Sequence, residues 1–209
     1  MDKLQIDSDH YLSCTYNDKQ RFISYWHQVQ GILELKPEKV LEIGIGSGLV
    51  SYYLRLIGNE IVTMDIDARL NPDIVGSVLD IPTQNESFDT VACFEVLEHL
   101  PYSSFHTALS ELHRVSSEHV ILSLPDANWS FGYSFHIPRL GERSWMVSAP
   151  RLRNRRHHFD GEHYWEIGKK GYSLKKVKYD MRCAGLIVEN TYRIFEQPYH
   201  RFFVLRPMP

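Results

Sequence analysis

Three glycines and two carboxylates form the clearest chemical pattern in the sequence. Gly44, Gly46 and Gly48 stand at alternate positions directly after an apolar stretch that contains Glu42. Glycine lacks a Cβ, so it accepts left-handed turns and lets backbone N–H groups approach a ligand. Asp65 ends the next apolar stretch, 21 positions after Gly44, where a carboxylate can accept hydrogen bonds from both hydroxyls of a ribose. The pattern predicts a site for a nucleoside-containing cofactor.

A second chemical pattern is the run from Glu95 to His99, which reads Glu-Val-Leu-Glu-His. On a helix, Glu95 would share a face with Glu98 and His99, because residues three and four apart are neighbours. Two carboxylates and an imidazole can hold a divalent metal, with His163 or His158 completing the set. His99 could instead act alone as a general base near neutral pH, or simply orient or cap a neighbouring helix.

Apolar strands that alternate with helical patterns must position these groups. Strands are expected at 40–43, 60–65, 73–78, 87–94 and 119–125, with helices at 49–56 and from Ser103 or Ser104 to Val115. Alternation of this kind predicts a parallel sheet, and ligands on such sheets bind outside the carboxyl ends of the strands. The strand ends near Gly44, Asp65, Asp80, Phe94 and Pro125 are therefore all expected on one rim.

The two ends of the chain add further elements. Asp18 is expected to cap a helix that runs to about Leu35 and packs on the sheet edge; a lid over the cofactor is the alternative. A helix after Ser173 and strands at 186–192 and 202–205 are expected to close the sheet as an antiparallel hairpin. Residues 126–172 are too long for an ordinary connection and predict a functional insertion on the substrate side.

The motifs resemble a known family. An acid followed by G-x-G-x-G at the end of a first strand resembles motif I of the class I S-adenosylmethionine (SAM) methyltransferases, and residues 88–100 are similar to the family's fourth motif, F-D-x-V…E-V-L-E-H-L. The nicotinamide-dinucleotide pattern would require Gly or Ala where Leu49 stands. The resemblance covers 40 to about 125 by motif and the C-terminus by architecture. It implies an α/β three-layer Rossmann-like sandwich, with a mostly parallel seven-stranded sheet and one antiparallel strand near the C-terminus.

The resemblance also implies how SAM is bound. Asp65 is expected to bind the ribose, with Asp67 as a nearby rival, and Ile66 to pack on the adenine. Asp80 is expected to accept from the adenine amino group, and Ile81 to cover the ring. The predicted cofactor residues are Glu42, Gly44, Ile45, Gly46, Gly48, Asp65, Ile66, Asp80, Ile81, Phe94 and Glu95.

Length and composition bound the remaining possibilities. The 209 residues predict one domain, 1–209, and the formal net charge of −3 does not favour nucleic acid as a partner. Cys14, Cys93 and Cys183 are odd in number and far apart, which indicates reduced thiols and a cytoplasmic protein. No apolar run is long enough to span a bilayer, so no membrane partner is expected.

These observations predict an enzyme that transfers a methyl group from SAM to an O, N or C atom of a small molecule bound under the 126–172 insertion. The arginines of 151–156 are either solvated surface or a receptor for an anionic acceptor. One alternative is a metal-assisted RNA-end ribose 2′-O-methyltransferase, because E-x-x-E-H with a later histidine resembles small-RNA 3′-end methyltransferases and some quinone-biosynthesis O-methyltransferases. Its metal would be bound by Glu95, Glu98, His99 and His163. The other alternative is a SAM-binding regulatory protein without catalysis.

Overall fold

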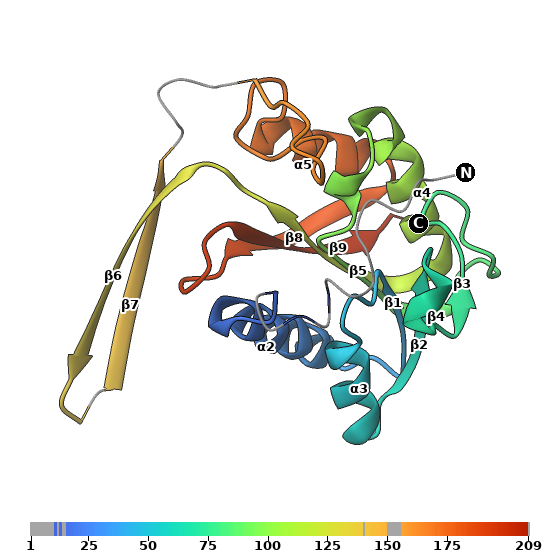
Figure 1. Cartoon of the computed structure of the whole chain (residues 1–209), viewed down its shortest axis with the longest axis horizontal. Helices are drawn as coiled ribbons and strands as arrows, with labels where there is room; N and C mark the ends of the chain where they lie inside the picture. Colours follow the sequence, from blue (N-terminus) through green and yellow to red (C-terminus); the bar gives the residue numbers. More distant parts are fainter. Residues whose placement is uncertain (1–10, 12, 14–15, 140, 150–155, 209) are drawn as a thin grey trace.

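Seven strands form one mixed sheet with helices on both faces (Figure 1). The computed structural model describes residues 11, 13, 16–139, 141–149 and 156–208; Cys14 and the arginines of 151–155 lie outside them. The strand order is β3-β2-β1-β4-β5-β9-β8. The strands are β1 (Lys39–Ile43), β2 (Glu60–Asp65), β3 (Ile74–Val75), β4 (Phe88–Phe94), β5 (Ser116–Pro125), β8 (Leu186–Arg193) and β9 (His200–Pro207).

The direction of the strands matches the expected fold class. The first five strands pair in parallel, and β9 runs antiparallel between β5 and β8. The closing hairpin of β8 and β9 thus places one antiparallel strand in an otherwise parallel sheet. The predicted three-layer sandwich is confirmed.

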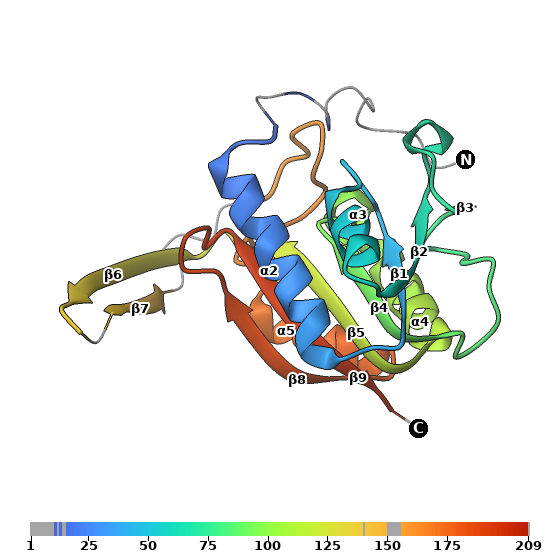
Figure 2. The same cartoon turned by 90° about the horizontal axis from the view of Figure 1, so that it is seen from below.

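The helices divide between the two faces of the sheet, as the two views show (Figures 1 and 2). One face carries α2 (Lys19–Leu35) and α3 (Leu49–Leu56), and the other carries α4 (Phe105–Val115) and α5 (Leu174–Cys183). Alternate strand residues face opposite layers, so Ala92 and Phe94 of β4 pack with α2 and α3, while Val91 and Cys93 pack with α4. Three short 3₁₀ turns, Ala68–Leu70, Leu97–His99 and Tyr102–Ser104, complete the described helical segments.

The N-terminal helix begins and ends where the sequence predicts. The Asp18 carboxylate accepts a hydrogen bond from the Arg21 N–H at 2.8 Å, and Lys36 ends the helix in the left-handed conformation. Its position differs from the expectation, because α2 lies over the central strands β4 and β5 rather than on the sheet edge. Phe22 and Trp26 of this helix are 51% and 60% exposed although both are large and apolar.

The third strand is much shorter than the predicted 73–78. Asp73 does not pair in the ladder, because its carboxylate accepts from the N–H and the hydroxyl of Thr63 at 2.8 and 2.7 Å. After Val75 the chain turns, and Ser77 bridges to Asp80. This turn shifts the residues that follow away from their predicted places, which matters at the site.

The 126–172 segment divides into two parts. Its first part is a hairpin of β6 (Trp129–Ile137) and β7 (Gly141–Ala149), which extends away from the sandwich (Figures 1 and 2). Its second part, from 156 onward, returns to the sheet. The fully buried indole of Trp165 donates to the Leu97 carbonyl at 3.2 Å, and the Ile167 N–H donates to the Pro125 carbonyl at 2.9 Å. Within the described residues, no helix has the length and apolar character to cross a membrane.

The packing of α4 on the sheet predicts how substitutions in this helix change the free energy of unfolding. Leu109 is completely buried between α4 and the sheet, so Leu109→Ala should lower the free energy of unfolding by about 3 kcal/mol through lost burial and a cavity. Thr107→Ala, on the exposed side of the same helix, should change it by less than about 0.5 kcal/mol. Denaturant unfolding of both variants is the measurement, and equal effects would contradict this packing.

Candidate active site

A cavity of about 370 Å³ opens at the carboxyl ends of β1, β2 and β4. Nine of its lining residues were expected at a site from the sequence: Glu42, Gly44, Ile45, Gly46, Asp65, Ile66, Phe94, Glu95 and His99. The volume falls in the range of small-molecule and cofactor pockets. The structure thus brings most of the sequence-predicted residues into one concave site.

The glycine loop fits closely around the cavity. Gly44 has a φ of +78°, and a Cβ built on it would overlap the Val96 side chain. Gly46 has a φ of +51° and faces the Tyr11 ring. A side chain at Gly44 would be both strained and obstructed, so glycine is required there. Gly48 is outside the lining, because it caps the N-terminus of α3.

Asp65 joins the two strands that frame this loop. Its Oδ2 accepts from the Ile45 N–H at 2.9 Å, and its Oδ1 accepts from the Asp67 N–H at 2.9 Å. Burial raises the pKa of the Asp65 carboxyl. The rival Asp67 also lines the cavity, but its carboxylate is occupied by Arg69 at 2.7 Å, and this contact lowers the pKa of Asp67. Asp65 is therefore the better-placed acceptor for a ligand hydroxyl.

Asp80 and Ile81, predicted at the adenine, are not brought to the cavity. Asp80 is exposed, and Ile81 is buried in the core with its N–H donating to Glu111 at 2.8 Å. The turn between Ser77 and Asp80 explains the difference, because it places Ser77 and Val78 in the lining instead. The family motif that predicts Asp80 and Ile81 at the adenine contains no signal of this turn.

The N-terminal segment supplies residues that no motif identified. Tyr11, Tyr16, Arg21, Tyr25 and Gln28 all line the cavity. The aromatic and basic residues of this segment were the only sign in the sequence of a role at the site. The alternative that the helix forms a lid over the cofactor agrees with this position. Tyr164 enters the lining from the returning part of 126–172.

Glu42 is a buried carboxyl group on strand β1. It is almost completely buried, and its Oε2 has no hydrogen-bond partner among the described residues. Burial raises the pKa of Glu42 to about 8, although hydrogen bonding with Ser51 and the charge of Arg55 offset part of the effect. At neutral pH the folded chain therefore keeps a proton on this carboxyl.

Two further carboxylates lie beside the cavity in a low-dielectric environment. Glu98 is completely buried, and neither of its side-chain oxygens has a hydrogen-bond partner among the described residues. Burial and the nearby Glu95 raise the pKa of Glu98 well above its usual value. Glu95 has a left-handed backbone with φ +52°, a strain that is typical of functional sites. The predicted shared helical face is not formed, because Leu97–His99 is a single 3₁₀ turn.

Two histidines complete this cluster. The ligand atoms of Glu98, His99 and His163 lie within 4.8 Å of one another. The His99 Nδ1 lies 3.0 Å from the Glu162 carbonyl, which can only accept, so Nδ1 carries the proton and Nε2 is the ring's acceptor. Burial lowers the pKa of His99, and the nearby His163 adds to the effect. His158, the alternative fourth residue, is exposed and outside this group.

Glu166 and His157 surround His163 on its other side. Glu166 Oε1 lies 3.7 Å from His163 Nδ1 and 3.9 Å from His157 Nδ1, and His157 Nε2 donates to the His163 carbonyl at 2.8 Å. Burial acts to lower the pKa of His163, but Glu166, Glu95 and Asp160 outweigh it and raise the pKa. These contacts fix the orientation of His163, as carboxylates commonly do for metal-binding histidines.

His200 was missed by the sequence analysis. It is buried, and its Nδ1 lies 2.8 Å from the Ser24 hydroxyl while its Nε2 lies 3.6 Å from Glu95 Oε2. Burial lowers the pKa of His200. Ser24 and His200 stand 176 positions apart in the sequence, so no local pattern could have identified this pair.

The cluster of Glu98, His99 and His163 fits a divalent cation. A buried carboxylate without donors is costly unless a positive charge compensates it. Carboxylate oxygen and imidazole nitrogen are common ligands of divalent transition metals. The structure therefore brings together three of the four residues in the predicted metal set, and Glu95 lies next to them.

Comparisons with known proteins agree with this fold. Residues 41–124 match the family model described as a methyltransferase domain. Over 84 residues the chain is 34% identical to a ubiquinone biosynthesis O-methyltransferase of Xanthomonas euvesicatoria pv. vesicatoria (strain 85-10), a match that covers 33% of this chain and 35% of the relative. The chain thus spans about a third of the length of the curated relatives it matches.

Solved structures share the whole architecture. The PH0226 protein of Pyrococcus horikoshii OT3 superposes with a TM-score of 0.63 at 15% identity, over 97% of this chain and 99% of that chain. The 1,6-didemethyltoxoflavin-N1-methyltransferase of Burkholderia thailandensis, solved with 1,6-didemethyltoxoflavin and S-adenosylhomocysteine, superposes with a TM-score of 0.60 at 13% identity, over 100% and 94%. At these identities the likeness concerns the fold.

The sheet order, the single antiparallel strand and the pocket beyond β1 and β2 define the Rossmann-like fold of class I methyltransferases. Residues 41–124 match a methyltransferase domain, so the resemblance to SAM-dependent methyltransferases predicted from the motifs is confirmed.

The raised pKa of Glu42 predicts a pH dependence. The unfolded chain releases the Glu42 proton near pH 4.5, whereas the folded chain holds it to about pH 8. The unfolded state therefore binds fewer protons in this window, and stability falls as pH rises, by about 1.4 kcal/mol per pH unit from this group. Glu42→Gln should remove that slope in denaturant unfolding measured between pH 5 and 8. Parallel slopes for wild type and variant would show that Glu42 is charged in the folded protein.

Proposed function

We propose that this chain binds SAM in the cavity and transfers its methyl group to an oxygen of a small-molecule acceptor. The observation that carries the proposal is that the glycine loop, joined to Asp65, lines the same cavity as Glu95 and His99. The loop and Asp65 suit a nucleoside, and Glu95 and His99 suit an acceptor. Residues suited to the methyl donor and residues suited to the acceptor therefore line a single pocket.

The residues that line the cavity indicate how SAM would be bound. Asp65 would accept from the ribose hydroxyls, and Ile66, 40% exposed beside it, offers an apolar surface to the adenine. Ser77 and Val78 take the place that the sequence analysis gave to Asp80 and Ile81. Phe94 and the loop backbone at Gly44 and Gly46 also line the cavity and would contact the rest of the cofactor.

The reaction itself asks little of the protein. When bound, SAM would supply a methyl group already activated by its sulfonium charge; the acceptor oxygen would take this group, and the thioether would be the leaving group. The protein must align the two reactants and remove one proton from the acceptor. The Nε2 acceptor of His99, a cavity residue, could take that proton, because its lowered pKa keeps the ring neutral at physiological pH.

The buried cluster supports a metal-assisted version of this chemistry. A divalent cation held by Glu98, His99 and His163 would lower the pKa of a bound hydroxyl and thus replace the general base. His99 would then be a ligand rather than a base. The curated relatives named above are O-methyltransferases, which supports oxygen as the accepting atom.

The same cluster favours a second candidate function, a metal-assisted methyltransferase acting on the terminal ribose of an RNA. A ribose has two adjacent hydroxyls that suit a divalent cation. The formal net charge of −3 gives no general attraction for a polyanion, so the small-molecule acceptor is preferred.

Calorimetric titration with SAM tests the cofactor assignment. Asp65→Ala removes the bonds to Ile45 and Asp67 as well as the ribose acceptor, and should weaken SAM binding about 100-fold or more. Asp80→Ala is the matched control, because Asp80 is exposed and outside the cavity, and should change the affinity less than about twofold. NAD should give no signal with the wild type. Binding of NAD without SAM, or an equal loss in the two variants, would contradict the assignment.

Binding of Mn²⁺ followed by electron paramagnetic resonance tests the metal. Glu98→Gln and His163→Gln should each weaken Mn²⁺ binding about 10- to 100-fold, whereas His158→Gln, an exposed neighbour, should not. Glu98→Gln should also raise the melting temperature in chelator, because it removes a buried carboxylate that has no partner. Wild-type protein that binds no Mn²⁺ would leave His99 as the base and would remove the RNA-end candidate.

A further inference from the structure

The hairpin of β6 and β7 is the part of the structure that the methyl-transfer site does not use. It extends from the sandwich as two strands paired over their whole length, from Trp129 with Ala149 to Ile137 with Gly141 (Figures 1 and 2). None of its described residues lines the cavity. A two-stranded hairpin is marginally stable in water by itself, so this one requires support from its base or a partner along its length.

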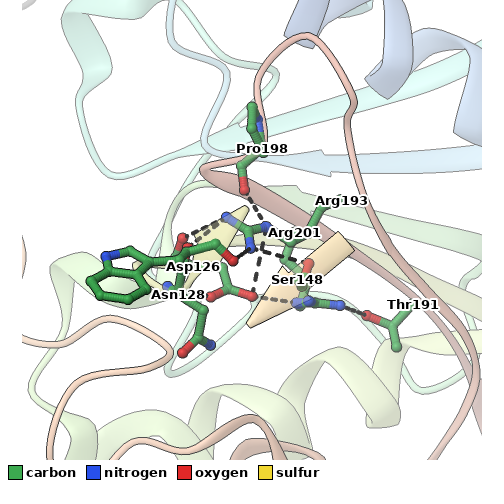
Figure 3. Close-up of polar contacts among 8 residues, drawn as sticks. Asp126, Asn128, Ser148, Thr191, Arg193, Pro198 and Arg201 are labelled. Atoms are coloured by element: carbon green, nitrogen blue, oxygen red, sulfur yellow. Dashed lines mark hydrogen bonds and ion pairs between the residues drawn. The ribbon is translucent and has the colours of Figure 1, made fainter. Parts of the chain in front are cut away.

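The base of the hairpin is firmly attached. Arg193 donates through Nη2 to the carbonyls of Asp126 and Asn128 at 3.2 and 3.1 Å, and through Nη1 to the hydroxyl of Ser148 at 3.3 Å (Figure 3). Arg201 donates to Asp126 Oδ2 at 2.6 Å. These contacts join the hairpin to β8 and β9, so its projection is set by the fold.

One face of the hairpin is apolar and open. Alternate residues of paired strands share a face, and the cross-strand partners place seven large apolar side chains together, with exposures of 36–62%. We call this set the aromatic face: Trp129, Phe131, Tyr133, Phe135, Ile137, Trp145 and Val147. The rings of Phe135 and Trp145 lie 5.1 Å apart on it.

The opposite face is polar and partly covered. Its described side chains are Ser130, Ser134, His136, Ser144, Met146 and Ser148, with Gly132 between them. Near the base, the Phe195 ring packs so closely on Gly132 that a Cβ there would lie 2.8 Å from it. The loop between β8 and β9 therefore covers part of the polar face, whereas no described residue covers the aromatic face.

Two exposed arginines lie toward the far end of the hairpin. Arg143 is paired with Phe135 and thus lies on the aromatic face, and Arg139 stands in the turn; both are exposed. In the sequence, residues 138–156 hold six arginines and one acidic residue, although the chain as a whole has a net charge of −3. The hairpin and its flank form a basic segment in an acidic protein.

We propose that the aromatic face docks on an anionic lipid surface. Tryptophan and tyrosine suit the headgroup level of a bilayer, and the arginines would contact lipid phosphates. A second copy of the chain is a poorer occupant, because a two-fold interface would bring the same arginine-bearing patch against itself. The sequence predicted no membrane partner because no segment can span a bilayer; docking on the surface needs no span.

Flotation with lipid vesicles tests this docking. Wild-type protein should float with vesicles of mixed phosphatidylglycerol and phosphatidylcholine, and less with phosphatidylcholine alone or at high salt. Phe131→Ser with Trp145→Ser should weaken binding about tenfold or more, through lost apolar burial. Arg139→Glu with Arg143→Glu should weaken it on anionic vesicles only. Ser134→Ala with Ser144→Ala, a cross-strand pair on the polar face, is the matched control and should bind as the wild type does.

Three results would overturn the proposal. The wild type could fail to float with anionic vesicles, or the aromatic-face variant could float equally well. Alternatively, light scattering could show a wild-type dimer that Phe131→Ser with Trp145→Ser converts to a monomer, without lipid binding, which would identify a second copy as the occupant. Melting temperatures of all variants within about 3 °C of the wild type would confirm that the changes act on the surface rather than on the fold.

Discussion

The Asp65 carboxylate is the interaction on which the pocket depends. Parallel strands end together, and the loops beyond them leave backbone N–H groups that need acceptors. Asp65 accepts from Ile45 in the glycine loop and from Asp67 in its own loop, while the Gly44 N–H donates to the Met64 carbonyl at 2.9 Å. The ends of β1 and β2 are thereby held in one arrangement. A loop that relies on glycine for its close turns gains its rigidity from this neighbouring strand.

A second constraint is the concentration of acid around the cavity. Glu42, Glu95 and Glu98 are all buried or nearly so, and each has an oxygen without a partner among the described residues. Such groups reduce stability in the unliganded protein, either by holding a proton or by remaining charged in a low-dielectric interior. Bound ligands would supply the missing partners, which explains why these carboxyl groups are buried. The fold thus gives up stability at the same edge where the glycine loop and the histidines would bind ligands.

The sequence predicted the fold well because its signals are local. The Asp18 cap, the apolar spacing of α4 and the alternation of strands and helices each depend on residues close together in the chain. The sequence did not predict the turn at Ser77, which leaves Asp80 and Ile81 outside the cavity. It also did not predict contacts between segments that are far apart in the chain. His200 pairs with Ser24, and Tyr164 reaches the cavity beside His99, through packing that no period in the sequence records.

The long segment between β5 and α5 shows why its length alone could not assign its role. The two halves of this segment differ: one returns to the site, and the other extends away from the sandwich. Its second half returns because Trp165 and Ile167 are apolar and have backbone or indole partners at the sheet, and this return brings His163 to His99. Its first half has equally large apolar residues, but their alternation with serine and glycine favours a flat two-stranded ribbon that cannot bury them on itself. Burial of large apolar side chains thus builds the site in one half, whereas in the other half the aromatic face stays open among the described residues.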